Sequence, residues 1–201
     1  MIKKIPTWVI VLASIVLVLF FIGASFTGTY NNMVTLRENV NGKWAQVQNV
    51  YQRRSDLIPN LVATVKAYAA HEKETLTAVI EARSQASQVK LEANDLTPEN
   101  LAKFQNAQKQ LSGSLSRLML VIEKYPDLKA NENFLALQSQ LEGTENRIAN
   151  ERRMFNDATR EYNTFIKLMP QALIAGITGF KDKAYFEADK EAEKAPKVNF
   201  E

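Results

Sequence analysis

The feature that most constrains this chain is an uncharged apolar run near its N-terminus. Between Trp8 and Ala24 the only hydroxyl group is that of Ser14, and Ile5 and Phe26 extend the run. The total is about the 20 residues that a hydrocarbon core of roughly 30 Å requires. A helix also satisfies its own backbone hydrogen bonds, which the interior of a bilayer demands. The run therefore predicts one membrane-spanning helix, with an anchor at residues 1–28.

A cleaved signal peptide is the alternative, because Lys3 and Lys4 form a basic start and Ile22–Ala24 resembles a cleavage site. The apolar run is longer than the roughly 7 to 15 residues of a signal peptide, which favours a retained anchor. The two N-terminal lysines favour an N-terminus inside the cell, while Arg37 and Lys43 oppose it. We expect a single-pass protein whose folded part lies outside the cytoplasm.

Composition favours helices for the rest of the chain. Only 7 Gly and 6 Pro among 201 residues leave few tight turns for a many-stranded sheet. The net charge of +3 comes from interleaved acidic and basic residues, so we expect no nucleic-acid partner. The absence of cysteine excludes disulfides and thiolate catalysis.

Apolar residues at spacings of four and three predict a long first helix, and they are Leu36, Val40, Trp44, Val47 and Tyr51. Pro59 lacks a backbone donor, so we expect a kink or a short break there. The helical pattern then resumes and fades near Lys90. In the loop that follows, Thr97 is a predicted N-cap and Pro98 a predicted first helical residue, with Leu96 stapled onto Leu101.

The next helix is expected to stop at Pro126, and the last long helix to start near Asn131 and end at Pro170. The last helix repeats an apolar residue every seven positions, which predicts a coiled-coil seam, at Phe134, Leu141, Ile148, Phe155, Tyr162 and Met169. The expected fold is all-α, with an antiparallel, four-helix-type bundle of coiled-coil-like packing at residues 29–186. The charged tail at 187–201 is expected to be disordered.

Arg53, Arg54 and Asp56 are candidate site residues beside the proline. Two guanidinium groups can bind an anionic ligand in a bidentate manner, but a salt-bridge cluster that ties a kink to a neighbouring helix is the more common arrangement. Gly113 and Gly143 each interrupt a helix at a cost of about 1 kcal/mol relative to alanine. Close approach of another backbone would compensate, either in a second copy of the chain or in a tight crossing within one chain.

The segment from Leu173 to Phe186 is apolar and aromatic, and it includes Phe180 and Tyr185. We favour a strap that closes the end of the bundle, and the alternative is a contact with the membrane surface. Phe180, Tyr185 and Phe186 are therefore candidate interaction residues in either case.

The sequence lacks a complete set of residues for the catalytic or metal sites considered. His71-Glu72 lacks the second histidine of a zinc helix, because position 75 is Thr, and it lacks the Glu-x-x-His spacing of di-iron bundles. The single histidine also leaves the serines without an identifiable base. We therefore expect neither a catalytic site nor a metal or other cofactor. A hydrolase or metal enzyme built from carboxylates and His71 remains the alternative.

Longer strings closely resemble the LemA family of bacterial membrane proteins. The longest of these strings are Arg53-Arg54-Ser55-Asp56-Leu57-Ile58-Pro59-Asn60-Leu61-Val62, Tyr125-Pro126-Asp127-Leu128-Lys129-Ala130-Asn131-Glu132-Asn133-Phe134 and Leu141-Glu142-Gly143-Thr144-Glu145-Asn146-Arg147-Ile148. The resemblance extends from Tyr30 to Ala188. It implies a membrane helix followed by an antiparallel bundle in the bacterial inner membrane, and a family of poorly defined biochemical role.

Together these patterns predict a membrane-anchored helical scaffold that acts through its surfaces. The expected partners are the lipid bilayer, further copies of the chain as a homo-oligomer, and other membrane proteins. The alternatives are the enzyme described above and a module that binds an anionic ligand at Arg53 and Arg54.

Overall fold

The computed structural model describes residues 6–187, and every regular element in that range is helical. The all-α prediction is confirmed. The predicted disordered tail lies, apart from residue 187, outside the described residues. In chain order the elements are α1 (Thr7–Tyr68), α2 (Lys73–Gln88), the 3₁₀ turn η1 (Ala93–Asp95), α3 (Pro98–Ile122), α4 (Pro126–Lys129), α5 (Glu132–Lys167) and α6 (Gln171–Thr178).

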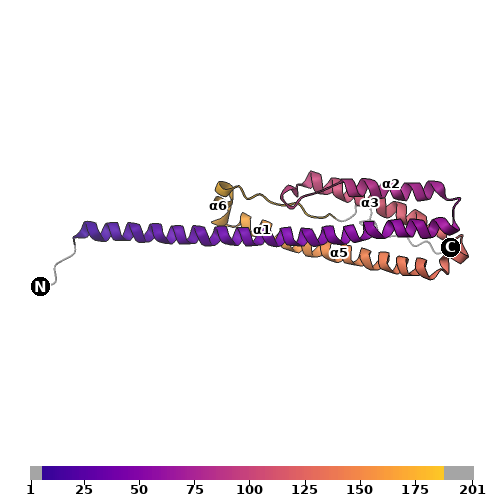
Figure 1. Cartoon of the computed structure of the whole chain (residues 1–201). Helices are drawn as coiled ribbons and strands as arrows, with labels where there is room; N and C mark the ends of the chain where they lie inside the picture. The colour runs from indigo at the N-terminus through magenta and orange to yellow at the C-terminus, as the bar shows by residue number, and fades with distance from the viewer. Residues whose placement is uncertain (1–5, 188–201) are drawn as a thin grey trace, which may run out of the picture.

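The four long helices form an antiparallel bundle with one helix extended far beyond it. Figure 1 shows α1 as a continuous rod, α2 running back beside its C-terminal part, α3 reversing again and α5 returning towards the N-terminal part. The closest helix pairs are α1 with α5 and α2 with α3. The short helix α6 lies at the end of the bundle from which α1 emerges.

The N-terminal part of α1 lies outside the bundle. Its apolar side chains are exposed, with Phe20 at 70% and Val16 at 64%. Within residues 6–187, α1 is the one helix that is long and apolar enough to cross a membrane by length and composition. The same helix then enters the bundle, where Met33 and Val40 are fully buried. The anchor candidate and the bundle therefore share one uninterrupted helix.

The core consists of two hydrophobic clusters along the bundle. The cluster nearer the apolar segment is aromatic, and the Trp44 ring lies 5.3 Å from that of Phe104 and 5.6 Å from that of Phe155. The distant cluster is mainly aliphatic and includes Ile58 and Leu118. Aromatic pairs at such distances contribute about 0.5–1.5 kcal/mol beyond the area they bury.

A kink or a short break was expected at Pro59, and the break is wrong, because α1 continues through the proline to Tyr68. Proline leaves the carbonyl four residues earlier without its helical donor. That carbonyl belongs to Ser55, and it accepts a hydrogen bond of 2.7 Å from Nε of Arg83 on α2. A side chain of a neighbouring helix therefore replaces the missing backbone donor.

The chain turns at Ala69–Glu72 instead, which the sequence pattern did not predict. These four residues include neither glycine nor proline, so no local signal marks the turn. The reversal is held by contacts with distant residues: the hydroxyl of Tyr125 donates to Glu72 over 3.0 Å, and the amide of Asn131 donates to the Tyr68 hydroxyl over 3.0 Å.

The predicted helix starts are confirmed. The Thr97 hydroxyl accepts from the backbone of Asn100, Pro98 opens α3, and the Asn131 side chain caps α5. Five members of the seven-residue row are buried, whereas Met169 lies beyond α5 and is 69% exposed. The row therefore packs within one chain, and coiled-coil geometry stays a prediction.

Candidate functional site

A fully buried arginine connects three helices in the middle of the bundle. Arg54 of α1 is 1% exposed. One terminal nitrogen donates to Glu145 of α5 over 2.7 Å and to Ser112 of α3 over 3.0 Å. The other terminal nitrogen donates to Gln108 of α3, and the guanidinium carbon lies 5.1 Å from the centre of the Tyr51 ring.

This arrangement favours a structural role over ligand binding. A buried charge is tolerated when it is paired and hydrogen-bonded, and the acceptors of Arg54 all belong to the same chain. The Nε atom of Arg54 is buried without a hydrogen-bond partner, so the pairing is not complete. The Glu145 side chain is 48% exposed, so solvent weakens this ion pair. The contacts fix the position of α1 relative to α3 and α5.

The other two residues of the predicted cluster are exposed, unlike Arg54. Arg53 is exposed, and exposed Asp56 accepts a hydrogen bond of 2.8 Å from Gln52 one turn earlier. The two arginines therefore do not form a joint anion site. Arg54 is in phase with Tyr51 and Ile58 on the buried stripe, a sequence signal that identifies it as the inward-facing member of the pair.

Gly113 and Gly143 are exposed, and a Cβ atom added to either would have open space around it. The tight crossing within one chain, expected as one alternative, is therefore wrong. Gly113 borders a groove of about 350 Å³ between α2 and α3.

A larger open groove of about 820 Å³ runs along the surface between α1 and α5, close to the apolar segment. Leu36 and Phe165 line it together with charged side chains, among them Lys43 and Asp157.

The candidate catalytic residues are not assembled. His71 is exposed in the turn after α1, and within residues 6–187 no group of three His, Asp or Glu side chains is placed to hold a metal ion. Ser112 is a partner of Arg54, and the Ser116 hydroxyl donates to the Ser112 carbonyl over 3.0 Å.

The C-terminal segment from Phe180 to Glu187 is a strap along the bundle. Phe186 is 5% exposed, and its ring lies 6.0 Å from Trp44 and 5.4 Å from Phe155. The backbone N–H of Phe186 donates to the side-chain oxygen of Asn156 over 2.9 Å, and the side-chain amide of Asn156 donates to the Phe186 carbonyl over 3.0 Å. Phe186 thus completes the aromatic cluster, whereas Tyr185 is 41% exposed.

Asn163 pairs with the strap in the same way, accepting from the backbone N–H of Lys183 over 2.9 Å and donating to its carbonyl over 2.8 Å. The sequence interpretation missed both asparagines. Asn156 and Asn163 lie seven residues apart, each directly after an aromatic member of the buried row, and that repeat is the signal that marks them.

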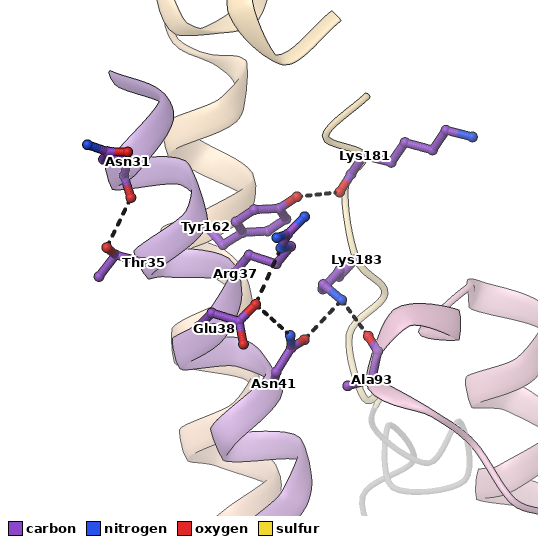
Figure 2. A network of polar contacts seen from close by, with 9 residues as sticks. All are labelled: Asn31, Thr35, Arg37, Glu38, Asn41, Ala93, Tyr162, Lys181 and Lys183. Atoms are coloured by element: carbon purple, nitrogen blue, oxygen red, sulfur yellow. Dashed lines mark hydrogen bonds and ion pairs between the residues drawn. The ribbon is translucent and has the colours of Figure 1, made fainter. Parts of the chain in front are cut away.

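Lys183 joins the strap to two other segments (Figure 2). Its ammonium group donates to the Ala93 carbonyl over 2.5 Å and to the Asn41 side chain over 3.4 Å. Asn41 in turn donates to Glu38 over 3.3 Å. Burial, with the nearby Arg37 charge, lowers the pKa of Lys183, and Glu38 partly opposes that shift. The junction therefore holds a partly desolvated charge.

Phe180 stands at the start of the strap, beside the exit of α1 from the bundle. Its ring lies 5.7 Å from the Tyr30 ring, and the Arg37 guanidinium lies 5.0 Å from its centre. The strap interpretation is thus supported for residues 180–187, while α6 leaves one face uncovered.

The described residues define a class of protein: an antiparallel four-helix bundle, closed by a C-terminal strap and continuous with an apolar helix long enough to span a membrane. A sequence model of the LemA family matches residues 43–200. The chain belongs to the LemA family, as the resemblance indicated.

The chain is also similar to proteins named for the magnetosome. It is 29% identical over 203 residues to magnetosome proteins MamQ 1 and MamQ 2 of Paramagnetospirillum magneticum, covering 90% of this chain and 73% of each relative. It is 30% identical over 178 residues to magnetosome protein MamQ of Magnetospirillum gryphiswaldense, covering 78% of this chain and 64% of that relative.

Proposed function

We propose that this protein is a membrane-anchored helical scaffold that acts through protein contacts and assembles with copies of itself. The observation that carries the proposal is the continuity of α1 from its exposed apolar segment to the middle of the bundle. From Phe26 to Arg54 the helix rises roughly 40 Å without a break. The bundle is therefore held at a defined height and orientation relative to its anchor.

The arrangement of polar groups favours a scaffold over the alternatives. The Arg54 guanidinium is directed to acceptors of its own chain, and Arg53 faces solvent on another side of α1. A ligand that needs both arginines finds no joint site. His71 has no partner set for acid–base or metal chemistry among the described residues.

Self-assembly is supported by the two open glycines. Exposed glycine inside a helix is less stable than alanine by about 1 kcal/mol and gains nothing within the single chain. A neighbouring copy that approaches the backbone closely at Gly113 or Gly143 would offset that cost. We place the anchor in the bacterial plasma membrane with the bundle on the periplasmic side.

Cross-linking in native membranes, followed by extraction and mass measurement, tests the assembly. We expect multiples of the 22.7 kDa chain, and fewer of them when Gly113→Leu or Gly143→Leu adds a side chain to the contact. Ala63→Leu on an exposed face of α1 is the matched control and should assemble normally. Circular dichroism checks that each variant folds.

A chain that stays monomeric in native membranes contradicts self-assembly. An unchanged oligomer in both glycine variants shows that neither glycine lies in the contact between copies. Sidedness is tested separately. The chain has no cysteine, so Ala63→Cys, at the exposed control position, provides a unique thiol. Labelling of intact spheroplasts by a membrane-impermeant maleimide supports a periplasmic bundle, and labelling only after lysis contradicts it.

A further inference from the structure

The outer surface of α6 is apolar and has no cover within the described chain. Four side chains form what we name the α6 apolar face. Leu168 (54% exposed) and Met169 (69%) lie just before α6, and Leu173 (60%) and Ile177 (80%) lie on the helix itself. Leu173 and Ile177 are four residues apart and so lie on the same side of the helix. Contiguous exposed apolar surfaces of this kind mark interaction sites.

The opposite surface of α6 is already used within the chain. Ile174 and Ala175 are 9% and 5% exposed and belong to the aromatic core cluster. The bundle therefore holds α6 by one face and presents the other outwards. Within residues 6–187 no segment covers the α6 apolar face.

The position of α6 identifies that surface. Phe180, two residues after α6, packs on Tyr30. Tyr30 is only four residues, or about 6 Å of helix rise, beyond the end of the apolar run at Phe26. Figure 1 shows α6 beside α1 where the helix leaves the bundle towards that run. If α1 spans a bilayer, α6 lies at the level of the lipid headgroups.

The composition of the segment fits the same location. Residues 168–180 carry no charge, and Lys167 and Lys181 stand immediately on either side. The Lys167 ammonium group pairs with Asp182 over 3.1 Å. Lys181 is the flanking lysine that can extend its ammonium group into the headgroup region. A second protein would require a matching apolar surface at this height, whereas the bilayer is already adjacent to α1.

The polar groups of α6 are largely satisfied internally, as a lipid environment requires. The Thr178 hydroxyl donates to the Ile174 carbonyl over 2.6 Å. At the C-terminal end Gly179 has a φ of 78°, and the N–H groups of Gly179 and Phe180 both donate to the Ala175 carbonyl over 2.9 and 3.1 Å. The left-handed conformation that glycine tolerates closes the helix end without leaving these donors free.

We propose that the α6 apolar face inserts into the bilayer surface next to α1 and gives the bundle a second membrane contact. This inference rests on the proposed membrane anchoring of α1. The two contacts would prevent the bundle from tilting away from the membrane about the anchor helix. The segment Leu173 to Phe186 then has two roles, in which α6 contacts lipid and the strap closes the bundle.

Spin labels on single cysteines test the proposal in the full chain, in vesicles of phosphatidylethanolamine and phosphatidylglycerol. Ile177→Cys and Leu173→Cys report on α6, and both positions are exposed, so labelling leaves the core intact. Phe20→Cys reports on the anchor. Leu120→Cys, 71% exposed near the end of α3, is the aqueous control. Circular dichroism confirms that each labelled variant is folded.

The readout is the ratio of collision rates with apolar oxygen and with a water-soluble nickel chelate. We expect a ratio several-fold higher at positions 177 and 173 than at 120, with the highest ratio at position 20. Water-like ratios on α6 together with a lipid-like ratio at position 20 would overturn the inference and leave the anchor intact. A water-like ratio at position 20 would overturn both. Low collision rates with both reagents and spin–spin broadening at 177 would instead assign the face to a second copy.

Discussion

The hydrogen bond from Arg83 to the Ser55 carbonyl should be energetically coupled to Pro59. Pro59 cannot donate to that carbonyl, and Ser55 is only 8% exposed, so water does not readily replace the donor. Arg83 Nε does so over 2.7 Å. The arginine therefore makes a proline tolerable inside a 62-residue helix.

The size of the coupling between Arg83 and Pro59 depends on how many donors can reach the Ser55 carbonyl in each variant. Arg83→Met keeps much of the aliphatic stem and leaves the carbonyl unpaired, which costs about 1–3 kcal/mol in free energy of unfolding. In a Pro59→Ala background the new backbone N–H reaches the same carbonyl. The Arg83→Met change should then cost less, and the coupling free energy should be about 1 kcal/mol.

Urea unfolding of the full chain in micelles, followed by far-ultraviolet circular dichroism, measures the four members of this cycle. Arg117→Met, at an exposed position on α3, is the control for loss of an arginine and should couple weakly to Pro59→Ala. If the Arg83 and Pro59 effects add to within about 0.5 kcal/mol, the donor-replacement argument is refuted.

Three further predictions concern the core. Phe186→Ala should lower the free energy of unfolding by about 3 kcal/mol, because it removes a buried ring. Tyr185→Ala should change it by less than about 0.5 kcal/mol, and equal thermal shifts in the two variants would contradict the strap. Arg54→Met should cost about 1–3 kcal/mol through its unpaired acceptors, whereas Arg53→Met should leave the urea midpoint nearly unchanged; similar midpoints would refute the assigned orientation. Burial raises the pKa of Tyr51 above 10.0, with the nearby Arg152 and Arg54 charges partly opposing the shift. Because the pKa of Tyr51 is higher in the folded than in the unfolded chain, its protonated hydroxyl contributes fully to the free energy of unfolding at pH values below the unfolded-state pKa. This contribution is lost as the pH rises through the folded-state pKa. Tyr51→Phe should therefore lose less stability than the wild type above about pH 10, and parallel curves of urea midpoint against pH would refute this.

Local sequence patterns were sufficient for several elements. The apolar run, the cap at Thr97 and the buried row of α5 depend on neighbours within one or two turns, and the structure has each of them where it was predicted, apart from Met169 at the end of the row. Helical periodicity is a property of the backbone, so the sequence alone reveals which faces are apolar.

The phase of the apolar stripe also distinguishes the two neighbouring arginines. Arg54 lies in register with Tyr51 and Ile58. That register places its side chain inside the bundle and that of Arg53 outside. Adjacent residues of a helix face different directions, so a pair of arginines in sequence is seldom a pair in space.

Only the tertiary structure decided the features that join distant segments. The sequence by itself determined an apolar anchor helix and a set of amphipathic helices. The continuity of α1 through Pro59 depends on Arg83, and the turn after Tyr68 depends on Tyr125 and Asn131. Such contacts form between residues that are far apart in the chain, so they follow from helix packing and not from local periodicity. The same packing buries one face of α6 and leaves the other exposed beside the anchor.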